Sequence, residues 1–223
     1  MSKKIFITGT GTEVGKTFVT ALIVKKMRDS GISAGYFKFA ASGEEIENIS
    51  ADAFYVKKIS GLQCDMKNFV PYSFKNSYSP HLAAKIENRP INFSVLEKDF
   101  LNAEKSFDFL TVEGSGGIIC PLRFDEKILM LDEVVKKFNL PAVIVVDSKL
   151  GEINSAVLTA EYLFAKKISV KGFIFNRFDE KNILHVDNKQ VIEKLTNLPT
   201  LATVKKNSVS LDISVEKLTG VYE

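Results

Sequence analysis

Short apolar runs alternate with longer amphipathic stretches along the chain, and this alternation predicts the fold. Each run is continuously apolar rather than broken by polar residues at every second position. That pattern is typical of strands buried on both faces in a parallel sheet. Six runs have the length of a strand: Lys4 to Thr8, Ala34 to Phe39, Phe107 to Glu113, Ala142 to Asp147, Gly172 to Asn176 and Thr200 to Val204.

The stretches between these runs carry the end signals of helices. Ser50 and Ser79 stand where N-caps belong, and Gly61 follows a helix end. The predicted helices are Lys16 to Asp29, Ala51 to Ile59, Pro80 to Glu87, Val95 to Ala103, Leu131 to Phe138 and Ser155 to Ala165. Gln63 to Tyr78 is predicted to be an excursion at the edge of the sheet. The alternation predicts a doubly wound α/β fold with a mostly parallel sheet, in which ligands bind beyond the carboxyl ends of the strands.

Composition narrows the class of protein. At 223 residues the chain can bury a substantial core and is expected to form a single domain. Its 30 Lys and Arg residues are scattered and exceed Asp and Glu by only three, so neither nucleic acid nor a membrane is expected as a partner. Two cysteines, Cys64 and Cys120, indicate a reducing compartment. Residues 1–4 lead directly into the first strand and no apolar run has the length of a membrane span, so a cytoplasmic protein is expected.

A glycine-rich turn joins the first predicted strand to the first predicted helix. It reads Gly9-Thr10-Gly11-Thr12-Glu13-Val14-Gly15-Lys16-Thr17. Such a turn directs backbone N–H groups and the positive end of the helix dipole toward one anion. Lys16 adds a charge for the outer phosphates and Thr17 a hydroxyl for Mg²⁺, which favours a nucleoside triphosphate over a tight turn without a ligand. The usual pattern has a glycine where this chain has Thr10, which indicates a subclass of P-loop protein.

Two further strands end in residues suited to the same chemistry. Lys38 lies at the end of the second run, next to its last residue Phe39, and small residues follow up to Gly43, although a lysine at a strand end is often only solvated. Glu113 ends the third run, before the turn Gly114-Ser115-Gly116-Gly117. A P-loop enzyme keeps the carboxylate that holds Mg²⁺, directly or through water, at this position, although a strand-end glutamate can also be a simple cap.

The fourth and fifth runs also end in polar segments. Residues 147–154 open a helix whose N-terminus could bind a second anion. Asn176-Arg177-Phe178-Asp179 could read a purine edge through its amide and carboxylate. Turn formation explains Asn176 equally well. The same four residues also resemble the Asn-Lys-x-Asp guanine reader of GTPases.

In this order, the motifs resemble those of the dethiobiotin synthetases, the ATP-dependent cyclo-ligases of biotin synthesis. The resemblance runs from the N-terminus to about Asn176. Its most specific parts are Gly9 to Thr17, which has that family's own spacing between outer glycines, and Val112 to Gly117. It implies that CO2 carbamylates one amine of 7,8-diaminononanoate and that the carbamate oxygen attacks the γ-phosphate of MgATP. The second amine then closes the ureido ring of dethiobiotin and expels phosphate.

The resemblance also implies roles for individual residues. Lys16 would act on the transferring phosphoryl group and Lys38 on the carbamate, with Thr12 beside them. Asn176 would read adenine, and His81 would be a bystander near the substrate. The nucleotide would be bound by Thr12, Glu13, Val14, Gly15, Lys16, Thr17 and Asn176; Mg²⁺ by Thr17, Asp52 and Glu113; and the diamine or its carbamate by Thr12, Lys38, Ser42, Gly117, Leu150, Gly151 and Asn154.

The family works as a homodimer with the active site at the interface. The tail carboxylate of the substrate would therefore bind the partner's loop matching Leu150 to Asn154, at a helix N-terminus. Two departures from the family pattern stand out. Phe39 follows Lys38 where the family has proline, and residues 201–206 replace a turn that helps to enclose the base. ATP remains the expected nucleotide.

Two other classes of protein share the fold. A nucleotide switch of the MinD/ParA kind carries an additional lysine early in the loop and often a membrane-binding tail. This chain has Gly9-Thr10-Gly11-Thr12 there, and residues 208–223 lack a strong apolar face flanked by basic residues. A cobyrinate-type amidoligase would need a glutaminase domain, for which the chain has no room. The spacing from Lys38 to Ser42 favours the carbamate-handling ligase.

Overall fold

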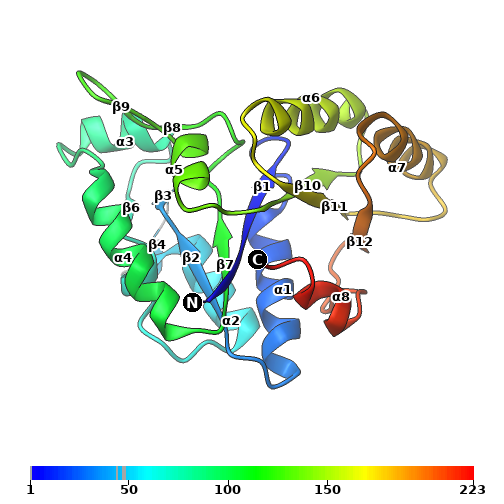
Figure 1. The fold of residues 1–223 in the computed structure, drawn as a ribbon, viewed down its shortest axis with the longest axis horizontal. Coiled ribbons are helices and arrows are strands. Elements are labelled where there is room, and N and C mark those ends of the chain that lie inside the picture. The colour runs from blue at the N-terminus through cyan, green and yellow to red at the C-terminus, as the bar shows by residue number, and fades with distance from the viewer. Residues whose placement is uncertain (1, 44, 47–48) are drawn as a thin grey trace.

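A six-stranded parallel sheet forms the centre of the molecule (Figure 1). The computed structural model describes residues 2–43, 45–46 and 49–223. The strand order is β12-β11-β10-β1-β7-β2. These strands are β1 (Lys3–Gly9), β2 (Ala34–Lys38), β7 (Phe109–Glu113), β10 (Ala142–Asp147), β11 (Val170–Asn176) and β12 (Thr200–Val204). All six predicted strands are therefore confirmed, with boundaries that agree to within two residues.

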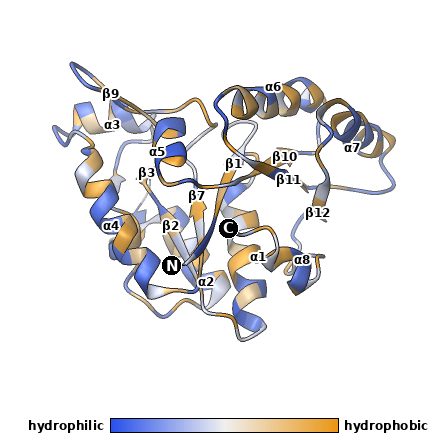
Figure 2. Cartoon of the chain, in the orientation of Figure 1, coloured by the Kyte–Doolittle hydropathy of each residue, from blue (hydrophilic) through white to orange (hydrophobic). Residues whose placement is uncertain are grey.

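Helices cover both faces of this sheet. One face packs against α1 (Lys16–Asp29), α2 (Ala51–Ser60) and α8 (Val215–Thr219), and the other against α4 (Phe93–Ser106), α5 (Leu131–Lys137), α6 (Glu152–Ala165) and α7 (Ile183–Thr196). Within β1, Ile5 and Ile7 pack on the face covered by α1, and Phe6 packs on the face covered by α4, because successive side chains of a strand point to opposite faces. Figure 2 shows the apolar residues gathered in the strands and on the helix sides that face them. The continuous apolar runs thus correspond to strands buried on both sides.

All six predicted helices are present, and their end signals are partly confirmed. The Ser50 hydroxyl accepts a hydrogen bond from Ala53 N at the start of α2, and Gly61 ends that helix with φ 69°. Ser79 precedes α3 (Pro80–Ile86) without capping it, because its hydroxyl lies 3.1 Å from His81 Nδ1 instead. The helices α7 and α8 were not predicted. No helix in the described part of the chain is long and apolar enough to cross a membrane.

Short strand pairs lie outside the main sheet. β3 (Ala40–Ser42) pairs with β6 (Tyr72–Phe74), β4 (Glu45–Ile46) with β5 (Ile49–Ser50), and β8 (Pro121–Phe124) with β9 (Ile128–Met130). The segment predicted as an excursion contains β6 and a 3-10 turn, Met66–Phe69. It therefore lies outside the main sheet, as the sequence indicated. Strand β3 follows Lys38 closely along the chain, and the β3–β6 pair helps to shape the cavity described next.

Candidate active site

A cavity of about 1020 Å³ lies at the carboxyl edge of β1, β2 and β7. Its lining comes from the loop between β1 and α1, the end of β2 with β3, the start of α2, residues 77–80, the turn after β7, and Arg177. The sequence analysis predicted that a ligand would bind at this edge, and the cavity lies there. Predicted site residues that line it are Thr12, Glu13, Gly15, Lys16, Thr17, Lys38, Ser42, Asp52 and Glu113.

The loop between β1 and α1 depends on glycine at two positions. A Cβ at Gly9 would lie 2.5 Å from Val14 Cγ2, and a Cβ at Gly15 would lie 2.0 Å from Asn176 Nδ2. Gly15 also has φ 94°, a left-handed conformation that glycine adopts without strain. Substitution at either position would push the loop away from its supports. Gly9 and Gly15 therefore determine the backbone conformation of the loop, and with it the directions of its N–H groups.

Lys16 lies over this loop and is almost fully buried. Its ammonium donates a hydrogen bond to Gly11 O at 2.8 Å. Burial lowers the pKa of Lys16 to about 8, an effect that the nearby Glu113 carboxylate only partly offsets and the Lys38 ammonium reinforces. An anion brought to the loop would favour the charged form of Lys16.

Four predicted side chains from four different elements meet beside Lys16. Lys38 and Glu113 are paired residues in the β2–β7 register, and the Lys38 ammonium lies 2.8 Å from Glu113 Oε1. The same ammonium lies 2.5 Å from Asp52 Oδ2 in the first turn of α2. The Thr17 hydroxyl in the first turn of α1 lies 2.7 Å from Glu113 Oε1 and 3.1 Å from Asp52 Oδ1. The cluster of Thr17, Lys38, Asp52 and Glu113 is called the carboxylate centre below.

The positive charge of Lys38 and the negative charges of the two carboxylates in the carboxylate centre stabilise one another. Burial works to lower the pKa of Lys38, but Glu113 and Asp52 outweigh it and hold that pKa well above its usual range. Burial works to raise the pKa of Asp52, and Lys38 outweighs it in the opposite direction. Glu113 Oε2 is buried and has no hydrogen-bond partner among the described residues. One oxygen of this carboxylate is therefore used by protein groups, while the other lacks a donor.

The residue that replaces the family proline has a structural role. Phe39 is 1% exposed, and its ring stacks on Phe138 with an angle of 9° between the ring planes. It also stacks on Phe100 at a centroid distance of 5.8 Å. This packing fixes the chain directly after Lys38. The departure at Phe39 therefore leaves Lys38 in the carboxylate centre.

The far end of the cavity is formed by small and hydroxylated residues. The Ser42 hydroxyl donates to Tyr78 O at 2.6 Å, and Ser115 donates to Ala40 O. Sequence analysis assigned no individual role in the site to six further residues that line the cavity, which are Tyr55, Ser77, Tyr78, Ser115, Cys120 and Arg177. Cys120 is a buried thiol whose pKa burial raises to about 11. Ser77 and Tyr78 follow β6 and Cys120 precedes β8, two short strands that the hydrophobic pattern did not reveal.

Asn176 lies behind the glycine-rich loop. Its Nδ2 donates to Val14 O at 2.9 Å, and its Oδ1 is buried without a partner among the described residues. The acceptor fixes the orientation of the amide, because a carbonyl oxygen attracts the NH2 group and repels Oδ1. Arg177 follows with φ 55° and donates to Glu13 O at 3.0 Å. The end of β11 thus holds the loop through Arg177, which lines the cavity, and through Asn176, which is not part of the lining.

Three predicted substrate residues lie away from the cavity. Leu150 is 82% exposed, Asn154 is also exposed, and Gly151 has φ 94° where α6 begins. Glu152, in the first turn of α6, accepts a hydrogen bond from the Thr10 hydroxyl at 2.7 Å. Within one chain, this loop therefore touches the glycine-rich loop but does not line the cavity. Gly117 is likewise not part of the lining.

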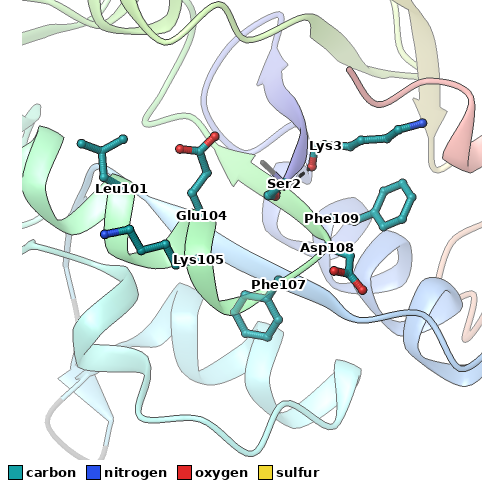
Figure 3. A pocket seen from close by; sticks show the side chains of 8 residues that line it. All are labelled: Ser2, Lys3, Leu101, Glu104, Lys105, Phe107, Asp108 and Phe109. Carbon is teal, nitrogen blue, oxygen red and sulfur yellow. Dashed lines mark hydrogen bonds between the residues drawn. The ribbon is translucent and has the colours of Figure 1, made fainter.

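A second cavity, of about 730 Å³, lies at the opposite edge of the sheet (Figure 3). Leu101, Glu104 and Lys105 of α4 line it together with residues 107–109 and residues 2–3 at the start of β1. None of the residues that the sequence singled out for chemistry contributes to it. The candidate active site is therefore the cavity at the carboxyl edge.

The chain is similar to known proteins over most or all of its length. A family model described as an AAA domain matches residues 3–212. The ATP-dependent dethiobiotin synthetase BioD of Clostridium botulinum (strain Okra / Type B1) is 44% identical over 226 aligned positions, covering 100% of this chain and 99% of that protein. The enzyme of the same name from Brachyspira hyodysenteriae is 45% identical, covering 95% of this chain and 96% of that protein.

Solved structures resemble the chain in fold. The MinC:MinD cell division protein complex of Aquifex aeolicus matches with a TM-score of 0.55 at 15% identity, over 99% of this chain and 86% of that chain. A ParA family ATPase from Chlorobium tepidum matches with a TM-score of 0.54 at 17% identity, over 92% of this chain and 85% of that chain. Such identities show a shared P-loop fold and no closer relation. The doubly wound fold predicted from the sequence is thereby confirmed.

Proposed function

The chain belongs to the ATP-dependent dethiobiotin synthetases, and we propose on that premise that the cavity at the carboxyl edge of its sheet is where the ureido ring is closed. The enzyme is an ATP-dependent ligase that forms carbon–nitrogen bonds. CO2 adds to one amine of 7,8-diaminononanoate, and an oxygen of the resulting carbamate attacks the γ-phosphorus of ATP. The second amine then attacks the carbamic–phosphoric anhydride, so the products are dethiobiotin, ADP and phosphate.

The observation that carries this proposal is the meeting of Lys16, Lys38 and Glu113 at one end of the cavity. Transfer of a phosphoryl group depends mainly on positioning and on charge neutralisation. Lys16 is placed over the glycine-rich loop, where the outer phosphates would bind. Lys38 retains its charge between two carboxylates and can bind a carbamate oxygen as negative charge builds on it.

The oxygens of the carboxylate centre fit Mg²⁺. This ion prefers oxygen ligands and usually takes one or two carboxylates together with substrate phosphates and water. Thr17, Asp52 and Glu113 would hold it, and the buried Glu113 Oε2 is an oxygen without a partner among the described residues. The described ranges contain no cluster of three or more His, Cys, Asp or Glu residues that could hold a metal ion alone, in keeping with an ion that is bound partly by ATP. When bound, Mg²⁺ would neutralise charge on the β- and γ-phosphates.

The diamine would lie between the loop and the β3–β6 pair. Thr12 and Ser42 face this part of the cavity and offer hydroxyls to the carbamate or the amines. Ala40 and Ala41 leave room for the carbon chain. The turn at Gly116, whose φ is 66°, brings the backbone close to Thr12. Gly117 would contribute through its backbone if the turn shifts as substrate binds.

Asn176 supports ATP as the nucleotide. Its NH2 group is committed to Val14 O, so the remaining Oδ1 can only accept a hydrogen bond. The amino group of adenine is a donor, whereas guanine presents a carbonyl oxygen at the same ring position. The Asn-Arg-Phe-Asp sequence therefore favours adenine in this setting, despite its resemblance to a guanine reader.

The exposed loop of Leu150, Gly151 and Asn154 supports a homodimer with the active site at the interface. One chain leaves this loop at the surface, while a helix N-terminus suits a carboxylate. In the proposed dimer, the loop of one protomer binds the tail carboxylate of the diamine held by its partner. A cytoplasmic location is part of the same proposal, because both cysteines are free thiols.

The experiment that tests the proposed function is release of phosphate from ATP by the purified chain. The proposal predicts that release requires both 7,8-diaminononanoate and bicarbonate, the source of CO2. Phosphate release that is unaffected by the diamine would instead support a nucleotide switch.

A further inference from the structure

Two consecutive side chains at the end of β11 hold two consecutive carbonyls of the glycine-rich loop. Asn176 Nδ2 donates to Val14 O at 2.9 Å, and an Arg177 terminal nitrogen donates to Glu13 O at 3.0 Å. These residues are more than 160 positions apart in the chain, so the contacts fasten the loop to a distant strand. Asn176 matches the base reader of the family, but Arg177 has no role in the reaction described so far.

The two contacts decide which way the loop peptides face. In a trans peptide the C=O and the following N–H point in opposite directions. With the Glu13 and Val14 carbonyls drawn toward β11, the N–H groups of Val14 and Gly15 point away from β11. Neither N–H has an acceptor in the part of the chain that the structure describes. Successive free N–H groups of this kind form a concave site for an anion.

The conformation of Glu13 needs such support. Its φ is 62°, in the left-handed region that residues other than glycine, asparagine and aspartate seldom adopt. The bond from Arg177 acts on the carbonyl of this same residue. Without it, the Glu13 peptide could rotate toward a more favourable conformation and turn the Val14 N–H away from the anion.

Arg177 is itself held in place from the other side. Its second terminal nitrogen lies 2.9 Å from Asp147 Oδ2, and Asp147 is the last residue of β10. The other Asp147 oxygen accepts from Ser148 N at 3.0 Å. The Asp147 side chain is 11% exposed and that of Arg177 is 43% exposed, and Lys149 Nζ lies 3.6 Å from the same Asp147 oxygen. A continuous chain of contacts therefore runs from β10 through Arg177 to the glycine-rich loop.

We propose that Arg177 is a positioning residue of the nucleotide site: braced by Asp147, it holds the Glu13 peptide so that the Val14 and Gly15 N–H groups are aimed at the phosphates of ATP. The proposal rests on the proposed function only in taking ATP as the ligand. It concerns binding of the nucleotide and requires no turnover. It can therefore be tested even if the diamine proves not to be the substrate.

The test is the dissociation constant of ATP, measured by calorimetry with and without Mg²⁺ and without diamine. Arg177→Asn removes the guanidinium and suits the left-handed backbone at this position, where φ is 55°. The proposal predicts that ATP binds about tenfold more weakly, the size expected for loss of a charge-assisted hydrogen bond. In turnover, the KM for ATP should rise by a similar factor while the KM for the diamine stays unchanged.

A second comparison isolates the effect on Glu13. In the Glu13→Asn background the left-handed conformation is tolerated, so removing Arg177 should weaken ATP binding by much less than tenfold. Equal losses in the two backgrounds would show that Arg177 does not act through Glu13. The matched control is Arg28→Gln, because Arg28 donates to backbone carbonyls at Ser60 and Gly61, beside the other end of α1. Its ATP affinity should equal that of the wild type.

The outcomes decide the proposal. An Arg177→Asn chain that keeps its thermal transition and binds ATP within twofold of the wild type overturns it. If that variant does not fold, Asp147→Asn replaces it, since this change keeps Arg177 and removes the negative charge that Arg177 and Lys149 face. A severalfold loss of ATP affinity in Asp147→Asn supports the proposal, and wild-type affinity overturns it.

Discussion

The Lys38 ammonium and the Glu113 carboxylate face each other across the β2–β7 strand pair, with Nζ 2.8 Å from Oε1. Lys38 is 4% exposed and Glu113 1% exposed. The pair links the residue proposed to bind the carbamate to a residue proposed to hold Mg²⁺. A change at either side chain is therefore expected to alter both chemistry and stability.

Lys38→Met should abolish the proposed reaction and destabilise the chain. Loss of the ammonium removes charge stabilisation from the transition state, which costs about 10²- to 10³-fold in rate. It also leaves Glu113 buried beside Asp52 without its paired cation, at a cost of about 3 kcal/mol in unfolding free energy. Urea unfolding and single-turnover assays would measure the two effects. Added Mg²⁺ should stabilise this variant more than the wild type.

The control for that variant is Lys25→Met. Lys25 pairs with Asp29 on the surface of α1, and exposed ion pairs of this kind contribute about 0.5 kcal/mol or less. Its stability and activity should stay close to those of the wild type. Near-normal turnover by Lys38→Met would remove Lys38 from the mechanism.

Binding of ATP should weaken as pH rises through about 8. Burial lowers the pKa of Lys16 to about 8 in the free chain, so the ammonium is mostly charged at pH 7 and mostly neutral at pH 9. ATP favours the charged form, and affinity is therefore greatest below pH 8 and lost above it. Calorimetry at pH 7 and pH 9 would measure the change. Lys16→Ala should bind ATP weakly at both values, and the same pH dependence in this variant would assign it to another group.

The nucleotide site should select adenine through the hydrogen-bond acceptor Asn176 Oδ1. Asn176 Oδ1 can accept from the amino group of adenine but faces a second acceptor if the base is hypoxanthine or guanine. ITP has a carbonyl oxygen in place of the 6-amino group of ATP and carries a proton on N1, and it should bind at least about tenfold more weakly, because its carbonyl oxygen and Asn176 Oδ1 would be two buried acceptors facing each other. GTP should bind weakly as well. Competition binding of the three nucleotides decides the matter, and equal affinities for ATP and ITP would exclude Asn176 Oδ1 as the reader.

Mixed dimers should regain activity that neither parent has. Lys16→Ala disables the phosphate end of the site, and Asn154→Asp places a negative charge where the partner's substrate carboxylate is proposed to bind. In a dimer with shared sites, a mixed pair contains one intact site. Co-expression of the two variants should therefore restore on the order of a quarter of wild-type activity. Activity no higher than that of the separate variants would exclude a site shared between protomers.

Much of the fold could be predicted because each strand of the parallel sheet is a continuous apolar run. The strand β10 was predicted with its observed ends, Ala142–Asp147. By contrast, α7 was missed because Ile183–Thr196 is largely polar and only Asn188, Ile192 and Thr196 are buried. Short pairs such as β3–β6 were missed because strands of three residues carry too little pattern. The meeting of Lys38 and Glu113 was predictable, since parallel strands bring their carboxyl ends to one edge.

The roles of Arg177 and of the Asn176 amide could not be predicted from the sequence. Both depend on contacts with carbonyls of the glycine-rich loop, more than 160 residues away. The backbone oxygens involved leave no mark on the sequence. For Asp52, the helix that carries it was predicted from Ser50 and Gly61. Its distance of 2.5 Å from Lys38 is known only from the structure.

The central claim is that a carbamate oxygen attacks the γ-phosphorus of ATP in this cavity. It is tested most directly by a brief reaction of the chain with ATP, 7,8-diaminononanoate and ¹⁸O-labelled CO2, followed by mass spectrometry of the phosphate before the label exchanges with water. The account predicts one ¹⁸O atom in the released phosphate, because the attacking oxygen leaves with phosphorus when the ring closes, and one in the ureido carbonyl of dethiobiotin. Phosphate that carries no label while dethiobiotin does would contradict it.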